Sequence, residues 1–532
     1  LTYPKRPRLS VLIDTTRNAL TDRRVLRSTT AVAMKNEKST ISSDLEKNLV
    51  VQLENPTSEC FVTEHATSHV VDWDGPDDLA RPVNWHKKRK WLNVTSIAFL
   101  TFLTPLASST VAPAEGLVIE SFNITSESLA SFVVSIYLVG FAVGPLALGP
   151  LSEIYGRLRI YQACNAVFIV WNIACAVAPN IGSLLAFRLF AGIAGSCPLT
   201  LGAGSVADLF VPEERGAAMS IYSMGPLMGP VIGPIAGGYL AEAAGWRWIF
   251  WVISMAAGAV FAFSLLFQSE SYEPVVLQRR VDRLKKETGN MMLRSKLAQN
   301  ISARDNFIRS IVRPTKMLFL SPIVAIFSVY LGIIYGYLYL LFTTITPVYQ
   351  TTYDFSQGAA GLTYLGIGVG SLIGLFIFGT ISDKILIYLT KRNNGVREPE
   401  FRMPPLIPGS LFIPIGLFWY GWSAEKQLHW IMPIVGTGWV AFGMLASFLP
   451  IQTYLVDAFS EHAASVTASM TVVRSLIGAF LPLAGPAMYA KLGLGWGNSM
   501  LGFIALAMLP LPVVFYYYGK RIRTYPMFKV TF

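Results

Sequence analysis

Arg188 lies inside a long apolar run of this chain, where a charged side chain could do chemistry, and Arg474 is the other cation well inside such a run. Arg188 and Arg474 each have no other charged residue within several positions. An arginine at membrane depth costs about 3 kcal/mol on insertion scales, so it normally faces a cavity or a partner. Arg188 lies a few residues from the end of its run, so its head group also has the alternative of reaching the membrane interface. Acids that would carry a proton are scarce inside the runs: Asp208, Asp383 and Asp457 all lie near their ends.

Other kinds of chemistry find little support in the residue types. Five His and four Cys argue against a zinc module or a disulfide scaffold. A membrane-embedded transferase would need His, Cys or acids clustered at one face, whereas His429 and His462 stand alone. The net charge of +11 would suit nucleic acid, but long uncharged blocks separate the basic clusters. We therefore expect no catalytic residue, no metal and no nucleic-acid partner.

The elements that position these residues are membrane spans. Of 532 residues, 53% are hydrophobic and only 14% charged, too few polar groups to cover a water-facing surface. Runs of about 20 apolar residues are long enough to cross a bilayer. Twelve are expected, in two groups of six: 91–111, 129–149, 159–178, 184–207, 217–240 and 246–267, then 322–345, 361–386, 406–423, 428–455, 464–489 and 497–519.

Loop charge predicts the orientation, because basic residues accumulate on the cytoplasmic side. Arg157 and Arg159 follow span 2, Arg215 follows span 4, and further basic groups follow spans 8 and 12. Both termini are therefore expected in the cytoplasm. The first outside loop is acidic and holds the glycosylation sequon at Asn123.

The domain organisation follows from the same map. We expect a disordered cytoplasmic tail, a first six-helix bundle, a basic cytoplasmic linker, a second six-helix bundle and a cytoplasmic tail, at residues 1–90, 91–267, 268–321, 322–519 and 520–532.

The two groups of spans echo each other. Gly149-Pro150-Leu151-Ser152-Glu153 ends span 2, and Gly379-Thr380-Ile381-Ser382-Asp383 ends span 8, at an offset of 230 residues. Asp208 and Asp457 occupy matching places at the ends of spans 4 and 10. Two parallel halves with matching charged ends suggest alternating access to a cavity between them.

At these residues the chain resembles the major facilitator superfamily. The stretch from Gly149 through Glu153 and Gly156 to Arg157 is similar to that family's loop motif after span 2, with Glu in place of Asp and the second cation displaced to Arg159. The resemblance implies a charge cluster that clamps the outward-facing state, with Asp208 as a further member. Plain topogenic charge is the alternative. Around Arg188 the chain resembles the family's span-4 motif, which implies a part in proton transfer.

Span 5 carries a regular pattern of glycines and prolines. Glycines at a spacing of four form a smooth stripe on one helical face, where a neighbouring backbone can approach. The prolines between them are expected to kink the helix. The stretch resembles the family's antiporter motif, which implies an exporter; a plain packing stripe is the alternative. Its residues are Gly225, Pro226, Gly229, Pro230, Gly233, Pro234, Gly237 and Gly238. Residues 72–85 and 269–277 resemble signatures of fungal drug:proton antiporters with twelve spans.

In that fold, spans 1, 4, 7 and 10 line the substrate cavity. Tyr335, Tyr339 and Phe342 fall on one face of span 7, and Met444 and Gln452 lie on span 10. Aromatic faces with a few hydroxyls suit flat, lipophilic or cationic organic molecules. Ordinary interhelical packing is an equal alternative for each residue.

The sequence thus predicts an all-α membrane protein of the major facilitator fold that exports small organic compounds in exchange for protons. A proton gradient takes the place of a cofactor, and the expected setting is the plasma membrane, with the monomer as the working unit. An uptake carrier for a nutrient, polyamine or siderophore is the first alternative, and a transporter-like membrane sensor is the second.

Overall fold

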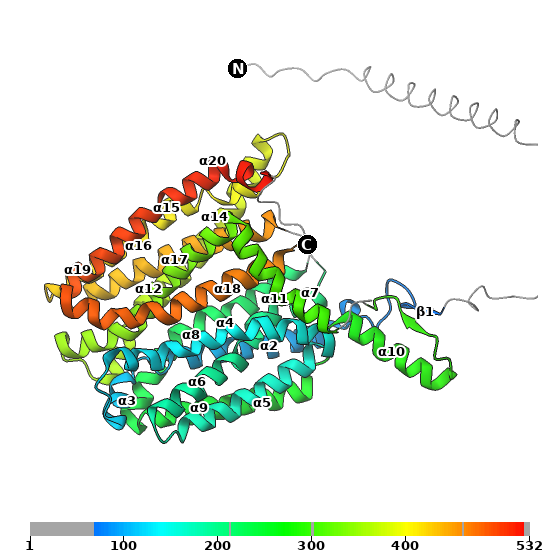
Figure 1. Ribbon diagram of the computed structural model, residues 1–532, viewed down its shortest axis with the longest axis horizontal. Coiled ribbons are helices and arrows are strands. Elements are labelled where there is room, and N and C mark those ends of the chain that lie inside the picture. Colours follow the sequence, from blue (N-terminus) through cyan, green and yellow to red (C-terminus); the bar gives the residue numbers. More distant parts are fainter. Residues whose placement is uncertain (1–68, 212–213, 299–302, 460–461, 526–532) are drawn as a thin grey trace, which may run out of the picture. The chain divides into compact units, whose positions relative to one another are not determined.

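The computed structural model describes residues 69–211, 214–298, 303–459 and 462–525, and most of these residues are helical (Figure 1). The first half contains α2 (Lys87–Ser109), α3 (Glu115–Phe122), α4 (Glu127–Tyr155), α5 (Arg157–Ala176), α6 (Ile181–Gly195), α7 (Cys197–Leu209), α8 (Arg215–Ala244) and α9 (Trp246–Phe267). The second half contains α12 (Pro322–Tyr353), α13 (Gln357–Leu362), α14 (Leu365–Arg392), η2 (Pro399–Arg402), α15 (Leu406–Ser410), α16 (Phe412–Glu425), α17 (Ile431–Ala458), α18 (Ala463–Phe480), η4 (Leu481–Ala484), α19 (Gly485–Met508) and α20 (Pro510–Thr524).

The expected spans all fall on helices. Nine helical segments of the described residues are long and apolar enough to cross a membrane. One of these segments, 463–524, holds two spans, since the chain turns at Gly493, whose φ of 72° interrupts the helix. Helix α8, with its three prolines, and the consecutive short helices α15 and α16 supply the remaining spans. The prediction of twelve spans in two groups of six is confirmed.

Each half uses the same helix pairs, which makes the internal repeat a structural one. In the first half α2 packs on α8, α4 on α6, and α5 on both α6 and α9. In the second half the equivalent spans pair in the same way: α12 with α18, α14 with α17, and α16 with both α17 and α19. Each half is therefore a self-contained bundle.

The junction between the halves is also two-fold related. Span 2 (α4) packs against span 11 (α18), and span 5 (α8) packs against span 8 with its preceding turn (α14 and α13). Figure 1 shows α4 and α18 side by side at this boundary. Interfaces built from equivalent spans allow one half to rock against the other about the junction.

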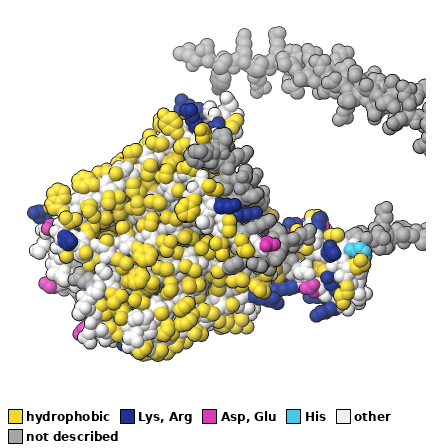
Figure 2. Space-filling view, viewed as in Figure 1, with side chains coloured by type: hydrophobic (Ala, Val, Ile, Leu, Met, Phe, Trp, Pro, Cys, Tyr) yellow, Lys and Arg dark blue, Asp and Glu magenta, His cyan; other side chains and the backbone are white. Residues whose placement is uncertain are grey.

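The outer surface of the bundle is apolar. Leu266 and Phe376 are each 76% exposed, although both lie in membrane-length helices. Hydrophobic side chains cover most of the face seen in Figure 2, while lysines and arginines gather near the helix ends. This surface is suited to lipid rather than to water.

The described part of the linker between the halves forms helices and a strand, and it contacts the segment that precedes span 1. It forms α10 (Glu273–Thr288), β2 (Arg294–Ser295) and α11 (Ala303–Leu320), and β2 pairs in parallel with β1 (Val70–Val71). Arg280 of α10 lies 2.5 Å from Asp74 and 2.8 Å from Asp78, and Arg81, just before η1 (Pro82–Asn84), lies 2.8 Å from Glu273.

These contacts correct the sequence prediction of a disordered tail that reaches residue 90. Residues 69–86 are ordered, because their acids meet the basic face of α10 and β1 pairs with β2. Polar composition alone predicted disorder, since the partners lie about 200 residues away in the chain. Residues 1–68 of that predicted tail lie outside the described residues.

Helices α2 and α8 approach so closely that their contact is between backbones. A Cβ added to Gly225 would lie 2.8 Å from Phe102 N, and one added to Gly229 would lie 2.8 Å from Leu106 N. A Cβ on Gly233 would lie 2.9 Å from Leu106 O, and one on Gly237 would meet Thr110 O. The spacing of four residues thus places a side-chain-free stripe against span 1, and α8 continues as one helix through its three prolines.

Replacing Gly229 by Val tests this contact. The branched side chain has to push α2 and α8 apart, which we expect to cost about 1–3 kcal/mol of folding free energy, as overpacking does. Gly258→Val in α9 is the matched control, since a Cβ there meets nothing within 4 Å. The apparent melting temperature of the purified protein should fall for Gly229→Val and change little for Gly258→Val. Equal melting temperatures would contradict the close approach.

Candidate functional site

Arg157 organises a charge cluster where α4 turns into α5. Its Nη1 donates to Ser152 Oγ at 2.8 Å, and its Nε lies 3.3 Å from Asp208 Oδ2 at the end of α7. Gly156 makes the turn between the helices with φ of +95°, a conformation that favours glycine. The cluster therefore ties the ends of α4, α5 and α7 together.

The acid that completes this cluster comes from the linker. Glu270 is 5% exposed, and its two oxygens accept the backbone N–H groups of Arg157 at 2.9 Å and Leu158 at 3.3 Å. A carboxylate there satisfies free amides at the N-terminus of α5 and suits the helix dipole. Glu270 lies within the signature at residues 269–277, but no local pattern connects it to Arg157, which is 113 positions away in the chain. Glu153, the acid of the loop motif, is exposed.

The second half repeats the cluster around Arg402, one of the basic residues that follow span 8. Its Nη1 lies 3.4 Å from Ser382 Oγ and 2.5 Å from Asp383 Oδ1, and its Nε lies 3.3 Å from Asp457 Oδ2. Ser382 and Asp457 are the counterparts of Ser152 and Asp208. The matching acids Asp208 and Asp457 indicate the repeat in the sequence. Arg402 itself lies in a loop whose sequence has no counterpart in the first half.

Arg188 is the largest fully buried side chain among the described residues. It is 1% exposed, and its Nη2 donates to the backbone carbonyls of Ser108 (3.2 Å) and Val134 (3.3 Å). Its guanidinium also lies 5.5 Å from the ring centre of Tyr137 and 5.8 Å from that of Phe250. Full burial excludes interfacial snorkelling in this conformation. Arg188 instead connects α6 to α2 and α4.

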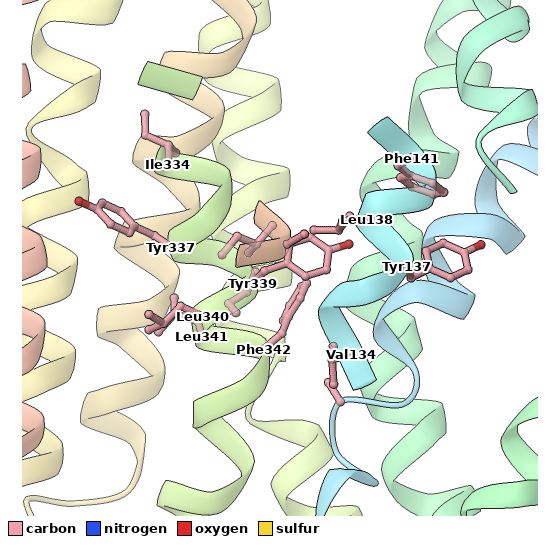
Figure 3. Close-up of a cluster of buried hydrophobic side chains, with 14 of the residues drawn as sticks. Val134, Tyr137, Leu138, Phe141, Ile334, Tyr337, Tyr339, Leu340, Leu341 and Phe342 are labelled. Atoms are coloured by element: carbon pink, nitrogen blue, oxygen red, sulfur yellow. The ribbon is translucent and has the colours of Figure 1, made fainter. Parts of the chain in front are cut away.

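The aromatic face predicted on span 7 forms a continuous cluster. The ring centres of Tyr335 and Tyr339 are 5.1 Å apart, and those of Tyr339 and Phe342 are 5.3 Å apart. In Figure 3, Tyr339 and Phe342 point from α12 towards α4 of the other half, near Leu138, whereas Tyr337 points away. Tyr339 and Phe342 are fully buried in this conformation, and Tyr335 is half-buried.

A short hydrogen-bonded path joins this cluster to Arg188. The Tyr339 hydroxyl lies 2.8 Å from Ser108 Oγ, and the carbonyl of the same serine accepts from Arg188. Because Ser108 belongs to the first half and Tyr339 to the second, separating the halves at this level breaks the Ser108–Tyr339 bond. Met444 and Gln452 are half-buried on α17, two turns apart.

Polar contacts also close the junction at the helix ends opposite Arg157, here called the α3 end. Glu242 of α8 accepts from Gly358 N at 2.5 Å and from Ser356 Oγ at 3.1 Å. Gln357 donates to Pro113 O, and a Cβ on Gly238 would lie 2.9 Å from Gln357 O. Gly238 thus faces the second half, unlike the α2-facing glycines of the same motif. Asn123, the predicted glycan acceptor, is exposed at this end and caps α3 with φ of +48°.

Glu115, the first residue of α3, is buried at the α3 end without a cation. Its Oε1 accepts from Ser131 Oγ at 3.3 Å, and its Oε2 is buried with no hydrogen-bond partner. No Lys, Arg or His of the described part of the chain lies within 4.0 Å of it, and the titratable Tyr364 of the second half lies near it. Burial raises the pKa of this carboxyl from its ordinary value of 4.5 to about 8. In the sequence Glu115 is one of the acids of the first outside loop, and no pattern there predicts its burial.

Two matching bundles that meet at a buried aromatic cluster, with an arginine held inside the membrane, define a polytopic membrane transporter. The chain belongs to the major facilitator superfamily, because the family model of that description matches residues 97–482.

Related proteins agree with this assignment. The chain is 63% identical over 469 residues to the MFS transporter cpaT of Aspergillus oryzae, which covers 88% of this chain and 95% of that protein. It is 46% identical over 468 residues to the efflux pump radE of Floropilus chiversii, and this alignment covers 88% of this chain and 87% of that protein. The E. coli xylose transporter XylE, in a partially occluded inward-open conformation, has the same fold, with a TM-score of 0.60 and 16% identity over 81% of this chain and 98% of that one.

The raised pKa of Glu115 predicts that the stability of the folded protein depends on pH. A carboxyl whose pKa is raised on folding stabilises the folded state fully below its unfolded pKa, and this contribution is lost as pH rises through the folded pKa. Stability should therefore fall between about pH 4.5 and 8, by up to about 1.4 kcal/mol per pH unit. The apparent melting temperature in lipid nanodiscs, followed from pH 5 to 9, should show this slope for the wild type and lose it in Glu115→Gln.

Glu120→Gln provides the control on the same helix, since Glu120 is exposed and should leave the slope unchanged. If Glu115→Gln followed the wild-type curve, Glu115 would not be the titrating group.

Proposed function

We propose that this chain exports small organic molecules across the plasma membrane in exchange for protons, as a monomer with both termini in the cytoplasm. The observation that carries the direction of transport is the glycine face of α8, which resembles the family's antiporter motif and lies directly against the backbone of α2. The name of the related efflux pump radE supports the same direction. So close a contact leaves little room for a leak between spans 1 and 5.

Alternating access follows from the way the halves are built. The Arg157 and Arg402 clusters each join helices of a single half, so each stiffens its own bundle. Movement is then concentrated at the α4–α18 and α8–α13–α14 junctions. Opening the α3 end has to break the contacts of Glu242 and Gln357, and it exposes Glu115 to water.

Two residues, Glu115 and Arg188, are the proposed coupling between protons and the change of conformation. Glu115 is neutral when the α3 end is closed, because a buried carboxylate without a cation is costly, and it can ionise when that end opens. Arg188 lies on the path that joins the halves through Ser108 and Tyr339. Binding or loss of a proton thus changes the balance between the two conformations.

The test is gradient-driven transport in inverted vesicles, with a panel of lipophilic organic compounds and fungal metabolites. Arg188→Ala removes both carbonyl contacts, and we expect gradient-driven accumulation to fall at least tenfold while binding remains. Arg188→Lys keeps the charge but loses the planar fork of donors, so it should be partly active.

Arg247→Ala is the control, since Arg247 is an exposed arginine that contacts one carbonyl, Ala178 O, at 3.2 Å. Normal accumulation in Arg188→Ala would remove Arg188 from the coupling mechanism. Accumulation that is indifferent to the proton gradient in the wild type would contradict proton exchange itself.

A further inference from the structure

Arg474 is the second arginine at membrane depth, and its setting differs from that of Arg188. It lies eleven residues into α18, about 16 Å along the helix from Ala463 at 1.5 Å per residue. The hydrocarbon core of a bilayer is about 30 Å thick, so Arg474 lies near its middle.

Arg474 is surrounded by aromatic rings rather than by acceptors. Its Cζ lies 4.7 Å from the ring centre of Tyr335 on α12 and 5.3 Å from that of Phe448 on α17. Its Nε is buried with no hydrogen-bond partner, and no carboxylate of the described residues lies within 4.0 Å of its guanidinium. Arg188 also has a buried Nε without a partner, but its Nη2 donates to two carbonyls.

The face of α18 that carries Arg474 is turned towards the other half. One turn further along the same face, a Cβ on Gly478 would lie 2.9 Å from Tyr335 Cδ1 and 3.0 Å from Leu138 Cδ1 of α4. Arg474, Tyr335 and Phe448 are all half-buried, unlike the fully buried Tyr339 next to them. These three side chains therefore lie at the boundary of the two halves, where alternating access opens the cavity.

We propose that Arg474, Tyr335 and Phe448 form the binding site for an acidic group of the cargo, so that the transported molecules are flat organic anions such as aromatic carboxylates. The guanidinium retains donors that a carboxylate can accept, and pairing there compensates for a charge buried at membrane depth. The two rings provide flat apolar contact for the rest of the ligand.

This assignment changes the cargo expected from the aromatic residues alone. Tyr335 and Phe448 would also attract an organic cation, but their faces are already occupied by the guanidinium, which repels a second positive charge. An anion leaving an inside-negative cell also moves down the electrical gradient. The direction of that movement rests on the proposed function, whereas the charge preference of the site does not.

Three probes with one ring system test the charge preference: 9-anthracenecarboxylate, its neutral carboxamide and the cationic 9-aminomethylanthracene. Equilibrium binding to the full chain in nanodiscs, at pH 7 and without a proton gradient, should favour the carboxylate at least tenfold over the other two. Arg474→Met should weaken carboxylate binding at least tenfold and leave the carboxamide unchanged. Arg474→Lys should retain part of the preference, and Arg247→Met should retain all of it.

Two results would overturn the proposal: a wild type that binds the cation or the carboxamide as well as the carboxylate, or an Arg474→Met variant that weakens all three probes equally. The wild-type series decides even if Arg474→Met fails to fold. Because binding is measured without a gradient, a charge preference can hold although export fails, and gradient-driven export can hold without any charge preference.

Discussion

The backbone contact between α2 and α8 is the constraint on which the rest of the bundle depends. Glycines at every fourth position let α8 lie against α2 with no side chain of α8 between them. That contact fixes the carbonyl of Ser108, which accepts from Arg188, and the hydroxyl of the same residue, which meets Tyr339 of the second half. A shift of α2 would disturb the buried arginine and the junction of the halves together. Span 1 therefore couples the packing of the first half to its junction with the second half.

Pseudo-symmetry explains why the two halves can move as bodies. The same span pairs recur in both, and each bundle carries a charge cluster in which one arginine joins a serine to an acid from another helix. Pairs of this kind, half-buried and held at 3.3 Å, contribute more than freely exposed ions because they are shielded from water and salt. The junctions consist instead of apolar packing and a few hydrogen bonds, which can be exchanged at small cost as the halves tilt.

The sequence predicts the parts of this structure that depend on local pattern. Apolar runs locate the spans, the matching ends of spans 2 and 8 reveal the repeat, and the spacing of glycines in span 5 indicates a face for close packing. Contacts between residues distant in the chain are not predicted by such local patterns. Glu270 and Arg402 act through residues that no local pattern connects to them, and the order of residues 69–86 comes from contacts about 200 positions away. The burial of Arg188, against the alternative of snorkelling, depends on carbonyls of two other helices. The unlike settings of Arg188 and Arg474 are invisible in a sequence where both are single arginines in apolar runs.

Distances between spin labels at both ends of the bundle test the central claim that the halves rock about their junction. One pair, at the exposed Glu120 and Leu428, reports on the α3 end, and another, at the exposed Arg159 and Tyr388, reports on the opposite end. When pH is lowered or cargo is added, pulsed electron paramagnetic resonance should show one distance lengthening as the other shortens. Two distances that stay constant, or that change in the same direction, would contradict the account.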